Sequence, residues 1–193
     1  MYQQIISALT QVVNFTEDEL FLFMKHFKPL EVPKNEFLLR PGQVCRAMVL
    51  IHRGALRYYN ESEKGEKTQG FGFELEWMGD YHSFLTRQPS DHYIQAMEDT
   101  EVFCLYYDDM QKLYGEGANF ERFGRLIAEG LFLATAAAKY DLLSLSAQQR
   151  YEKLLKLNPR IMQRVPQQYV ATYLGIAPQS LSRIRGKLSS SKD

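Results

Sequence analysis

The sequence of 193 residues has few cysteines, no long apolar segment and no net charge. Its two cysteines, Cys45 and Cys104, are far apart and outside any metal-ligand spacing, which argues against a disulfide framework and a zinc-binding motif. No apolar run approaches the roughly 20 residues that a membrane-spanning helix requires. The first residues, MYQQIISALTQVV, lack the cationic region and apolar block of a secretory signal. We therefore expect a cytoplasmic protein with reduced cysteines and no membrane partner.

Motifs of catalysis are missing as well. The sequence has no glycine-rich phosphate loop, no nucleophile elbow and no Cys/His constellation, so we expect no enzyme and no catalytic residue. His52, His82 and His92 could converge on a metal ion, with Asp80 or Glu76 completing the site. There is no His-x-His pair, however, and we favour separate surface or partly buried histidines over a metal site.

The formal net charge of zero conceals an uneven distribution. Residues 145–193 contain nine of the 23 Lys and Arg and only two of the 23 Asp and Glu, a net charge of +7. The remaining residues contain 14 basic and 21 acidic side chains, a net charge of −7. A basic end on an acidic body is expected when one domain binds nucleic acid and the other has a different task.

The stretch from Val165 to Leu188 predicts two short helices joined by a tight turn. The first helix stops at Gly175, a residue that tolerates positive φ. Pro178 suits the first position of the second helix, where its missing N–H is not needed. In the second helix we expect Leu181, Ile184 and Leu188 on the buried face and Gln179, Ser180, Arg183 and Lys187 on the exposed face. This pattern is typical of a helix-turn-helix; the alternative is a helical hairpin with a solvated basic face.

Two different kinds of signal precede this basic end. Helices are expected at residues 2–13, after a capping box formed by Thr16 and Glu19, and after Asp108 with Gln111. Between them, strands are expected at 48–51, 55–60, 67–73, 93–98 and 100–107, with a hairpin at Glu63-Lys64-Gly65-Glu66. Short strands at regular spacing without intervening helices indicate an antiparallel barrel or roll, and hence an α+β protein.

A long helix is expected from Asn119 to about Ser144. Its seam repeats at spacings of three and four, which is typical of a contact between helices; the seam residues are Phe120, Phe123, Ile127, Gly130, Ala134 and Ala137. Leucines at other positions could cover the β-roll, namely Leu126, Leu133, Leu142 and Leu143. We favour a dimer helix over one packed wholly within its own subunit. Ser146 with Gln149 is expected to cap the helix that follows.

This organisation resembles the cyclic-AMP receptor / fumarate–nitrate regulator (Crp/Fnr) superfamily of bacterial transcription factors along nearly the whole chain. The resemblance is carried by Leu39-Arg40-Pro41-Gly42, by the segment 51–57 (IHRGALR), and above all by Tyr173-Leu174-Gly175-Ile176 with Ser182-Arg183-Ile184-Arg185. It implies a cyclic-nucleotide-binding-like β-roll (a double-stranded β-helix) at 1–118, a dimerisation helix at 119–145 and a helical or winged helix-turn-helix domain at 146–193. It also implies a homodimer on a near-palindromic operator, with RNA polymerase as a further candidate partner.

The resemblance assigns contacts to double-stranded DNA. The family's recognition helix often begins with an Arg-Glu pair and has another Arg a turn later; the matching positions here are Pro178, Gln179 and Arg183, so the first arginine is absent. Arg183 is the best candidate for a base or phosphate contact, because its fork can take guanine O6 and N7 together. Gln179 and Ser180 could reach base edges. The expected phosphate contacts are Gln168, Arg185 and Lys187.

The effector site departs from the family pattern. Relatives that bind cyclic nucleotides have Gly-Glu for the ribose and, about ten residues later, Arg-Ser or Arg-Thr for the phosphate. Here Gly79-Asp80 and Ser90-Asp91 stand at these positions, so the cation is missing and an acid is beside the gap. A buried phosphate would lack a counter-charge unless Arg87 replaced it. The cysteine cluster of the oxygen-sensing relatives is also absent. We expect no cofactor and no response to cyclic AMP.

Two functions of different class follow. The first is a DNA-binding transcriptional regulator of the Crp/Fnr type, either ligand-gated or constitutive. The second is a small-molecule-sensing or protein-interaction module whose helix-turn-helix no longer reads DNA. The salt dependence of DNA affinity distinguishes them, because phosphate contacts release counterions.

Overall fold

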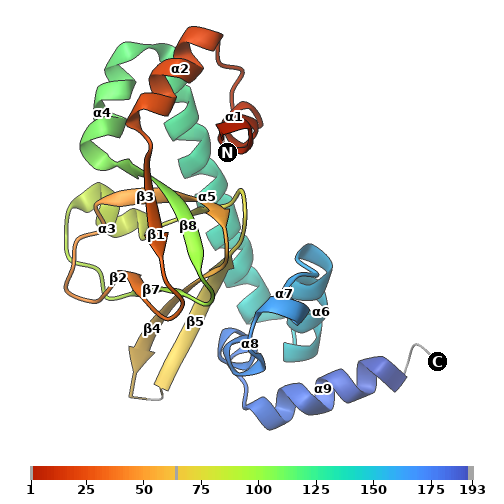
Figure 1. Cartoon of the computed structure of the whole chain (residues 1–193). Coiled ribbons are helices and arrows are strands. Elements are labelled where there is room, and N and C mark those ends of the chain that lie inside the picture. The colour runs from red at the N-terminus through yellow and green to blue at the C-terminus, as the bar shows by residue number, and fades with distance from the viewer. Residues whose placement is uncertain (1, 64, 191–193) are drawn as a thin grey trace. The chain divides into compact units, whose positions relative to one another are not determined.

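The computed structural model describes residues 2–63 and 65–190 (Figure 1). These residues form two compact units. The first contains the chain up to residue 58 together with residues 71–131, and the second contains residues 59–70 and the chain from residue 132 onward. Because the division crosses two strands and one helix, three elements contribute residues to both units.

Two four-stranded sheets form the β-roll. The order of the first is β1 (Lys28–Val32), β8 (Thr100–Tyr106), β3 (Ala47–Arg53), β6 (Trp77–Met78). The order of the second is β2 (Phe37–Leu39), β7 (Tyr93–Ala96), β4 (Leu56–Ser62), β5 (Gly65–Gly72). The pairs β1–β8, β3–β8, β3–β6 and β2–β7 are all antiparallel, so the predicted antiparallel roll in an α+β fold is confirmed. In the predicted hairpin β4 and β5 are neighbours and Gly65 has φ 97°, while Lys64 lies outside the described residues.

The centre of the roll is buried on both faces of its strands. In β3 residues 48–51 are all buried, and in β8 so are residues 102–105. One face of each strand looks into the roll, and the other packs against aromatic residues of the helical end; Phe27, for example, meets Phe103 edge to face at 6.4 Å between ring centroids. A strand covered on both sides has no polar face, which is why both sets of alternating side chains in β8 are apolar.

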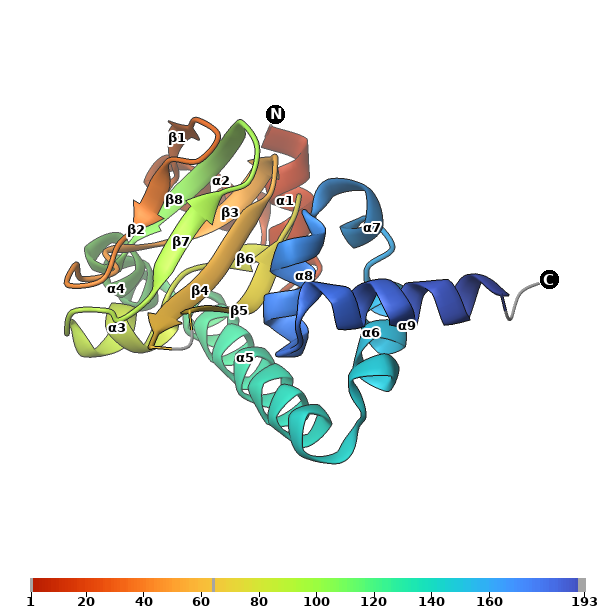
Figure 2. The ribbon, with the colours of Figure 1, turned by 90° about the horizontal axis from the view of Figure 1, so that it is seen from below.

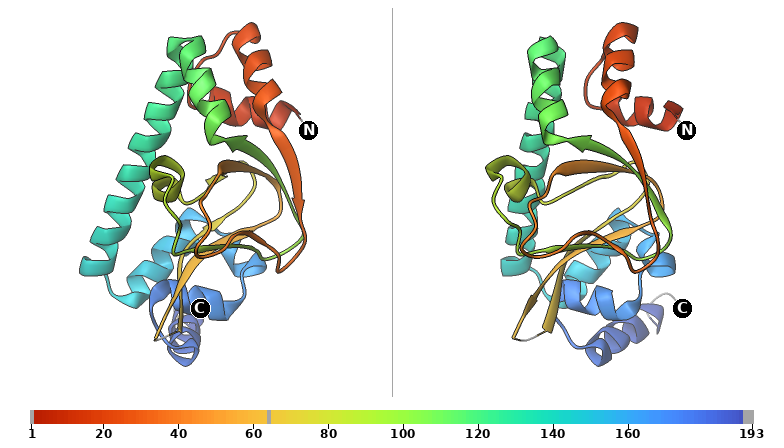
Figure 3. Two further views of the ribbon diagram at one scale, coloured as in Figure 1. Left: turned by 90° about the vertical axis from the view of Figure 1, so that its left-hand side faces the viewer. Right: turned by 60° about the vertical axis from the view of Figure 1, so that its left-hand side comes forward.

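Helices gather at one end of the roll, where Figures 1 and 3 show α1, α2 and α4 beside the first part of α5. Their bounds are α1 Tyr2–Thr10, α2 Glu17–His26, α4 Tyr107–Glu116 and α5 Ala118–Ser144. The predicted capping box is confirmed: the Glu19 N–H donates to the Thr16 hydroxyl and the Thr16 N–H to the Glu19 carboxylate. The predicted cap at Asp108 is wrong. Helix α4 begins at Tyr107, directly after β8, and its N-cap Tyr106 makes no side-chain capping bond.

Helix α5 is buried only near its beginning. Phe120 and Phe123 join a cluster of phenylalanines with Phe15 and Phe23, whose ring centroids are 5.2–6.0 Å apart. Leu126 also packs against this core, as predicted. The prediction that Leu133, Leu142 and Leu143 cover the β-roll is wrong, because all three side chains are exposed.

The second unit contains the C-terminal helices. Besides the end of α5, they are α6 (Ala147–Leu157), α7 (Ile161–Arg164), α8 (Gln167–Leu174) and α9 (Pro178–Ser190). The capping box of Ser146 and Gln149 is present, as predicted. The small core of the unit consists of Tyr151, Ile161, Val165, Val170, Ala171, Leu174 and Leu181. From residue 132 to residue 190 the described elements are all helices, so this segment contains no strand that could serve as a wing. None of the described helices is long and apolar enough to cross a membrane.

Candidate nucleic-acid interface and effector site

The turn between α8 and α9 is built on one glycine (Figure 2). Gly175 has φ 67° and ψ 33°, the left-handed conformation in which a side chain would be strained. Its N–H donates to the carbonyls of Ala171 and Thr172, and the Ile176 N–H donates to Ala171 at 3.1 Å. These bonds satisfy the last carbonyls of α8 and turn the chain into α9 at Pro178, where the sequence predicted the second helix.

Helix α9 separates an apolar face from a polar one. Leu181 is buried, and Ile184 and Leu188 are half-buried. The exposed face carries Gln179, Ser180, Arg183 and Lys187. Arg183 lies three or four residues from each of the others, so it is their neighbour on the helix surface. The structure thus brings four of the six predicted DNA contacts onto one surface of one helix. Gln168 is also exposed, near the start of α8.

Arg185, the remaining predicted contact, is on a different face of α9. It follows Leu181 by four residues and borders a cleft of 800 Å³ with Tyr151 and Met162. Burial raises the pKa of Tyr151, and the nearby Arg185 charge opposes this shift. The phosphate contact of Arg185 stays a prediction.

Two further interactions position α8, and neither was predicted. The Arg150 guanidinium, from α6, donates to the carbonyls of Leu145 and Leu174, each at 2.7 Å. It thus holds the C-terminal end of α8, where a cation is favoured by the helix dipole. The Thr172 hydroxyl donates to the Tyr169 carbonyl at 2.9 Å and shares a 2.7 Å hydrogen bond with the buried Thr68. Leu174 is 24 residues from Arg150, and Thr68 is 104 residues from Thr172, so no local sequence pattern could reveal either contact.

Asp80 is the centre of the expected effector site, and its carboxylate is already occupied by protein groups. It is the N-cap of α3 (Tyr81–Thr86) and accepts the Ser83 N–H at 3.1 Å. The Ser90 hydroxyl donates to it at 2.6 Å, and His92 Nδ1 lies 3.4 Å from the same oxygen. Asp80 and Ser90 are both buried. The structure therefore joins the two side chains that the resemblance assigns to ribose and phosphate, and they bind each other.

The electrostatics of this cluster agree with a closed site. Burial acts to raise the pKa of Asp80, but the hydrogen bonds from Ser90 and Ser83 and the His92 charge outweigh it, and the pKa is lowered. The Tyr58 ring stacks on His92 at 4.6 Å between centroids. Burial, and then the Asp80 charge, raise the pKa of Tyr58. Asp80 is thus held as an anion by protein donors and shielded by an aromatic side chain.

The other residues of the expected effector site serve the fold or face solvent. Gly79 lies against the sulfur and methyl end of the Met48 side chain, which would have to move aside for a Cβ at this position. Asp91 is exposed. The Arg87 guanidinium donates to the carbonyls of Cys45 and Phe84, at 3.2 and 3.3 Å, and lies over the Tyr107 ring. It therefore does not take the place of the missing phosphate-binding cation beside Ser90.

The histidine–carboxylate metal site, which we considered from the sequence and did not favour, is not assembled among the described residues. His92 is beside Asp80, but His52 has a different acidic neighbour, Glu101, at 3.9 Å. No group of three or more His, Cys, Asp or Glu side chains among the described residues is arranged to hold a metal ion.

Comparison with known proteins finds one family model and several solved structures that are similar to this chain. Residues 29–116 match the family model of the cyclic nucleotide-binding domain. FixK2 from Bradyrhizobium japonicum superposes with a TM-score of 0.72 at 16% identity, over 86% of each chain. The c-di-GMP-responsive global regulator CLP of Xanthomonas campestris gives 0.69 at 17% identity, over 92% of this chain and 93% of CLP. The catabolite activator protein of Thermus thermophilus gives 0.60 at 18% identity, over 96% and 88%. No curated protein matches the sequence.

Proposed function

We propose that this chain, a cyclic nucleotide-binding domain whose structural neighbours are Crp/Fnr regulators, is itself a DNA-binding transcriptional regulator of the bacterial cytoplasm. It acts as a homodimer on a near-palindromic operator and does not respond to cyclic AMP. Residues 1–118 form its sensor domain, 119–145 its dimer helix and 146–193 its DNA-binding domain. RNA polymerase is a further candidate partner.

The observation that carries the proposal is the pair α8 and α9. The left-handed Gly175 sets the angle between two short helices, and Leu181 anchors the second on the unit's core. This leaves Gln179, Ser180 and Arg183 exposed at the N-terminal part of α9, which is the part of a recognition helix that enters the major groove. Gln179 and Arg183 have the functional groups that read adenine and guanine edges, respectively.

Phosphate contacts and base contacts have separate roles on this surface. Lys187 and Gln168 are exposed beside the base-reading residues and would bind the DNA backbone, which positions the protein without specifying sequence. The positive charge of residues 145–193 supports this role, because phosphate neutralisation supplies most of the non-specific affinity.

Dimerisation is supported by an apolar stripe on the second half of α5. Phe132, Tyr140 and Leu143 are 72%, 67% and 77% exposed, and Ala136 completes the spacing of four, four and three residues along one face. Such a stripe is unfavourable in water and typical of a contact between helices. The exposure of these side chains argues against a helix packed wholly within its own subunit.

The proposal that cyclic AMP is not the effector is supported by the Asp80 cluster. A nucleotide would have to displace the Ser90 hydroxyl from Asp80 and separate Tyr58 from His92. No cation at position 90 would compensate its phosphate. The alternative function is a sensing or interaction module that no longer reads DNA. It is equally compatible with the Asp80 cluster and differs in the role of α9.

Selection of bound sequences from genomic DNA fragments tests the reading function. The purified full chain, without added ligand, should enrich a palindromic motif. Arg183→Ala should weaken binding to that motif by about tenfold or more, because a bidentate guanine contact contributes roughly 1–3 kcal/mol. Arg160→Ala is the matched control: it removes the same charge from an exposed position in the same basic segment. Equal losses in both variants would contradict base reading by Arg183, and no enrichment at all would favour the alternative function.

The dimer helix is tested by the mass of the protein in solution. Leu143→Glu places a charge in the apolar stripe and should yield a monomer in light scattering after size exclusion. Leu157→Glu, at an equally exposed leucine of α6 (73%), should leave the mass of a dimer unchanged. A monomeric wild-type protein would contradict the proposed dimer directly.

A further inference from the structure

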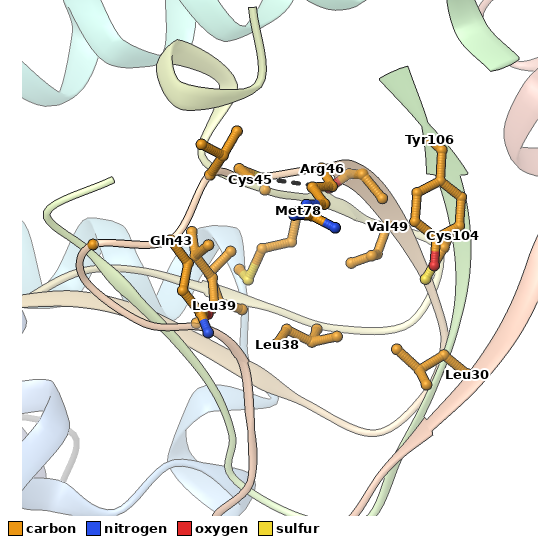
Figure 4. Close-up of a pocket in the computed structure, with 15 residues that line it drawn as sticks. Leu30, Leu38, Leu39, Gln43, Cys45, Arg46, Val49, Met78, Cys104 and Tyr106 are labelled. Carbon is orange, nitrogen blue, oxygen red and sulfur yellow. Dashed lines mark hydrogen bonds between the residues drawn. The ribbon is translucent and has the colours of Figure 1, made fainter. Parts of the chain in front are cut away.

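A cavity of 610 Å³ lies in the first unit, and neither Asp80 nor Ser90 is among its lining residues. This volume is in the range of pockets that bind small molecules. Side chains from both sheets make its apolar walls, among them Leu38 and Leu39 of β2, Val49 of β3 and Ile94 of β7. Figure 4 shows these walls with Met78 and Cys104 around one common space. Of the four residues expected at the effector site, only Gly79 borders it.

Gln43 and Arg46 supply nitrogen donors to the lining, which also includes Tyr106. Arg46, in the loop before β3, is exposed, and Figure 4 shows its guanidinium directed into the space between the walls. Its backbone is fixed, because its carbonyl accepts the Tyr107 N–H at 3.0 Å. Gln43 is held by a 3.0 Å bond from the Arg40 N–H to its side-chain oxygen, which leaves the amide hydrogens as the groups it can offer to a ligand.

Arg46 is the one charged side chain among the described residues that line the cavity. None of the described residues that line it is an Asp or Glu. Burial raises the pKa of both thiols in the lining, Cys45 and Cys104, to about 11, so both are neutral at pH 7. Arg46 forms no ion pair with a carboxylate of the described residues, whereas Arg53 pairs with Glu101 and Arg125 with Glu129. An anion is therefore the ligand that this lining complements.

We propose that this cavity binds a small organic acid, an aliphatic or aromatic body with one carboxylate, which Arg46 holds through a bidentate contact. The fork of a guanidinium matches the geometry of a carboxylate, and Gln43 can donate a further hydrogen bond. The apolar walls take the body of the ligand. A phosphate monoester fits less well, since its second charge would have no partner between apolar walls. The proposal does not depend on DNA reading, because binding is measured on the protein alone.

Calorimetric titration of the full chain with octanoate tests this site, and octanamide is the neutral comparison of the same length. Octanoate should bind with a dissociation constant of about 1 mM or tighter. Arg46→Gln should weaken octanoate binding by about tenfold or more, because a charge-assisted hydrogen bond is lost. Arg46→Lys, which keeps the charge but not the fork, should bind with intermediate affinity. Arg53→Gln is the control. It removes an arginine charge from an exposed side chain at the end of β3, and Arg53 does not line the cavity.

Tighter binding of octanoate than octanamide by wild type and Arg53→Gln, together with the loss in Arg46→Gln, supports the site. Unchanged unfolding midpoints in urea show that the variants are folded. No saturable octanoate binding to the wild type overturns the proposal, and so does equal affinity for octanamide or an Arg46→Gln protein that binds as well as wild type.

Discussion

Asp80 and Gln179 are both polar residues at the start of a helix, yet their surroundings are opposite. Asp80 is buried, caps α3 and accepts hydrogen bonds from Ser83 and Ser90. Gln179 is exposed on α9 and has no side-chain hydrogen bond to the described residues. A buried group whose hydrogen bonds are satisfied within the chain contributes to the fold, whereas an exposed group without a partner is available to another molecule. The Asp80 side chain therefore stabilises the fold, and the exposure of Gln179 fits the proposed role of α9 as a binding surface.

The largest expected effect is on stability, in the β-roll. Asp80→Ala removes a helix cap and leaves the Ser90 hydroxyl and the Ser83 N–H without their acceptor. We expect a loss of about 2–4 kcal/mol in the free energy of unfolding. Gln179→Ala should change it by less than about 0.5 kcal/mol, because the side chain is exposed. Urea denaturation of both variants measures the two effects, and equal losses would remove the distinction between the sites.

The next expected effect is on the acid sensitivity of the fold. The pKa of Asp80 is lowered in the folded chain, so below its unfolded value of about 3.9 the unfolded state binds the proton more readily. The stability that the ionised carboxylate provides is thus present above that pH and is lost as the pH falls through the folded pKa. Asp80→Asn has no such contribution. The stability difference between wild type and variant should shrink below about pH 4, and a difference that is constant with pH would contradict an ionised Asp80.

The smallest effect concerns the binding surface itself. Lys187→Ala should weaken DNA binding to a similar extent on all sequences and reduce the slope of log affinity against log salt by about one. Gln179→Ala should instead leave the salt slope unchanged and relax the sequence preference. Fluorescence anisotropy on the selected motif and on a scrambled duplex, over a series of salt concentrations, distinguishes these behaviours. A Gln179→Ala slope that changes like that of Lys187→Ala would place both residues on phosphates.

What the sequence could predict depends on how close the interacting residues are along the chain. The capping boxes at Thr16 and Ser146 and the turn at Gly175 involve neighbours within four residues, and all three are confirmed. The order of secondary-structure types and the α+β fold follow from similar local patterns. The cap at Asp108 failed because β8 runs directly into α4, so the chain has no free turn in which that side chain could act as a cap.

The parts that local patterns could not predict are formed by residues distant in sequence. Tyr58 stacks on His92, and Arg150 reaches the carbonyl of Leu174 across 24 residues. The cavity beside Arg46 is assembled from six strands and a loop. No single segment of the sequence therefore predicts its volume, or that none of its described lining residues is an Asp or Glu. The Asp80 cluster is of the same kind, because Ser90 and His92 are ten or more residues from Asp80 in the sequence and meet it only in the folded chain.

The hydrogen bond between Thr68 and Thr172 has a practical consequence for dividing this protein. Residues 59–70, which include Thr68, are grouped with the C-terminal helices although they lie far upstream of them in the chain. A fragment that begins at residue 132 would lose this hairpin and leave the Thr172 hydroxyl facing water. Chimaeras that exchange the sensor while keeping α8 and α9 should therefore carry a hydroxyl residue at the position of Thr68 on the grafted hairpin.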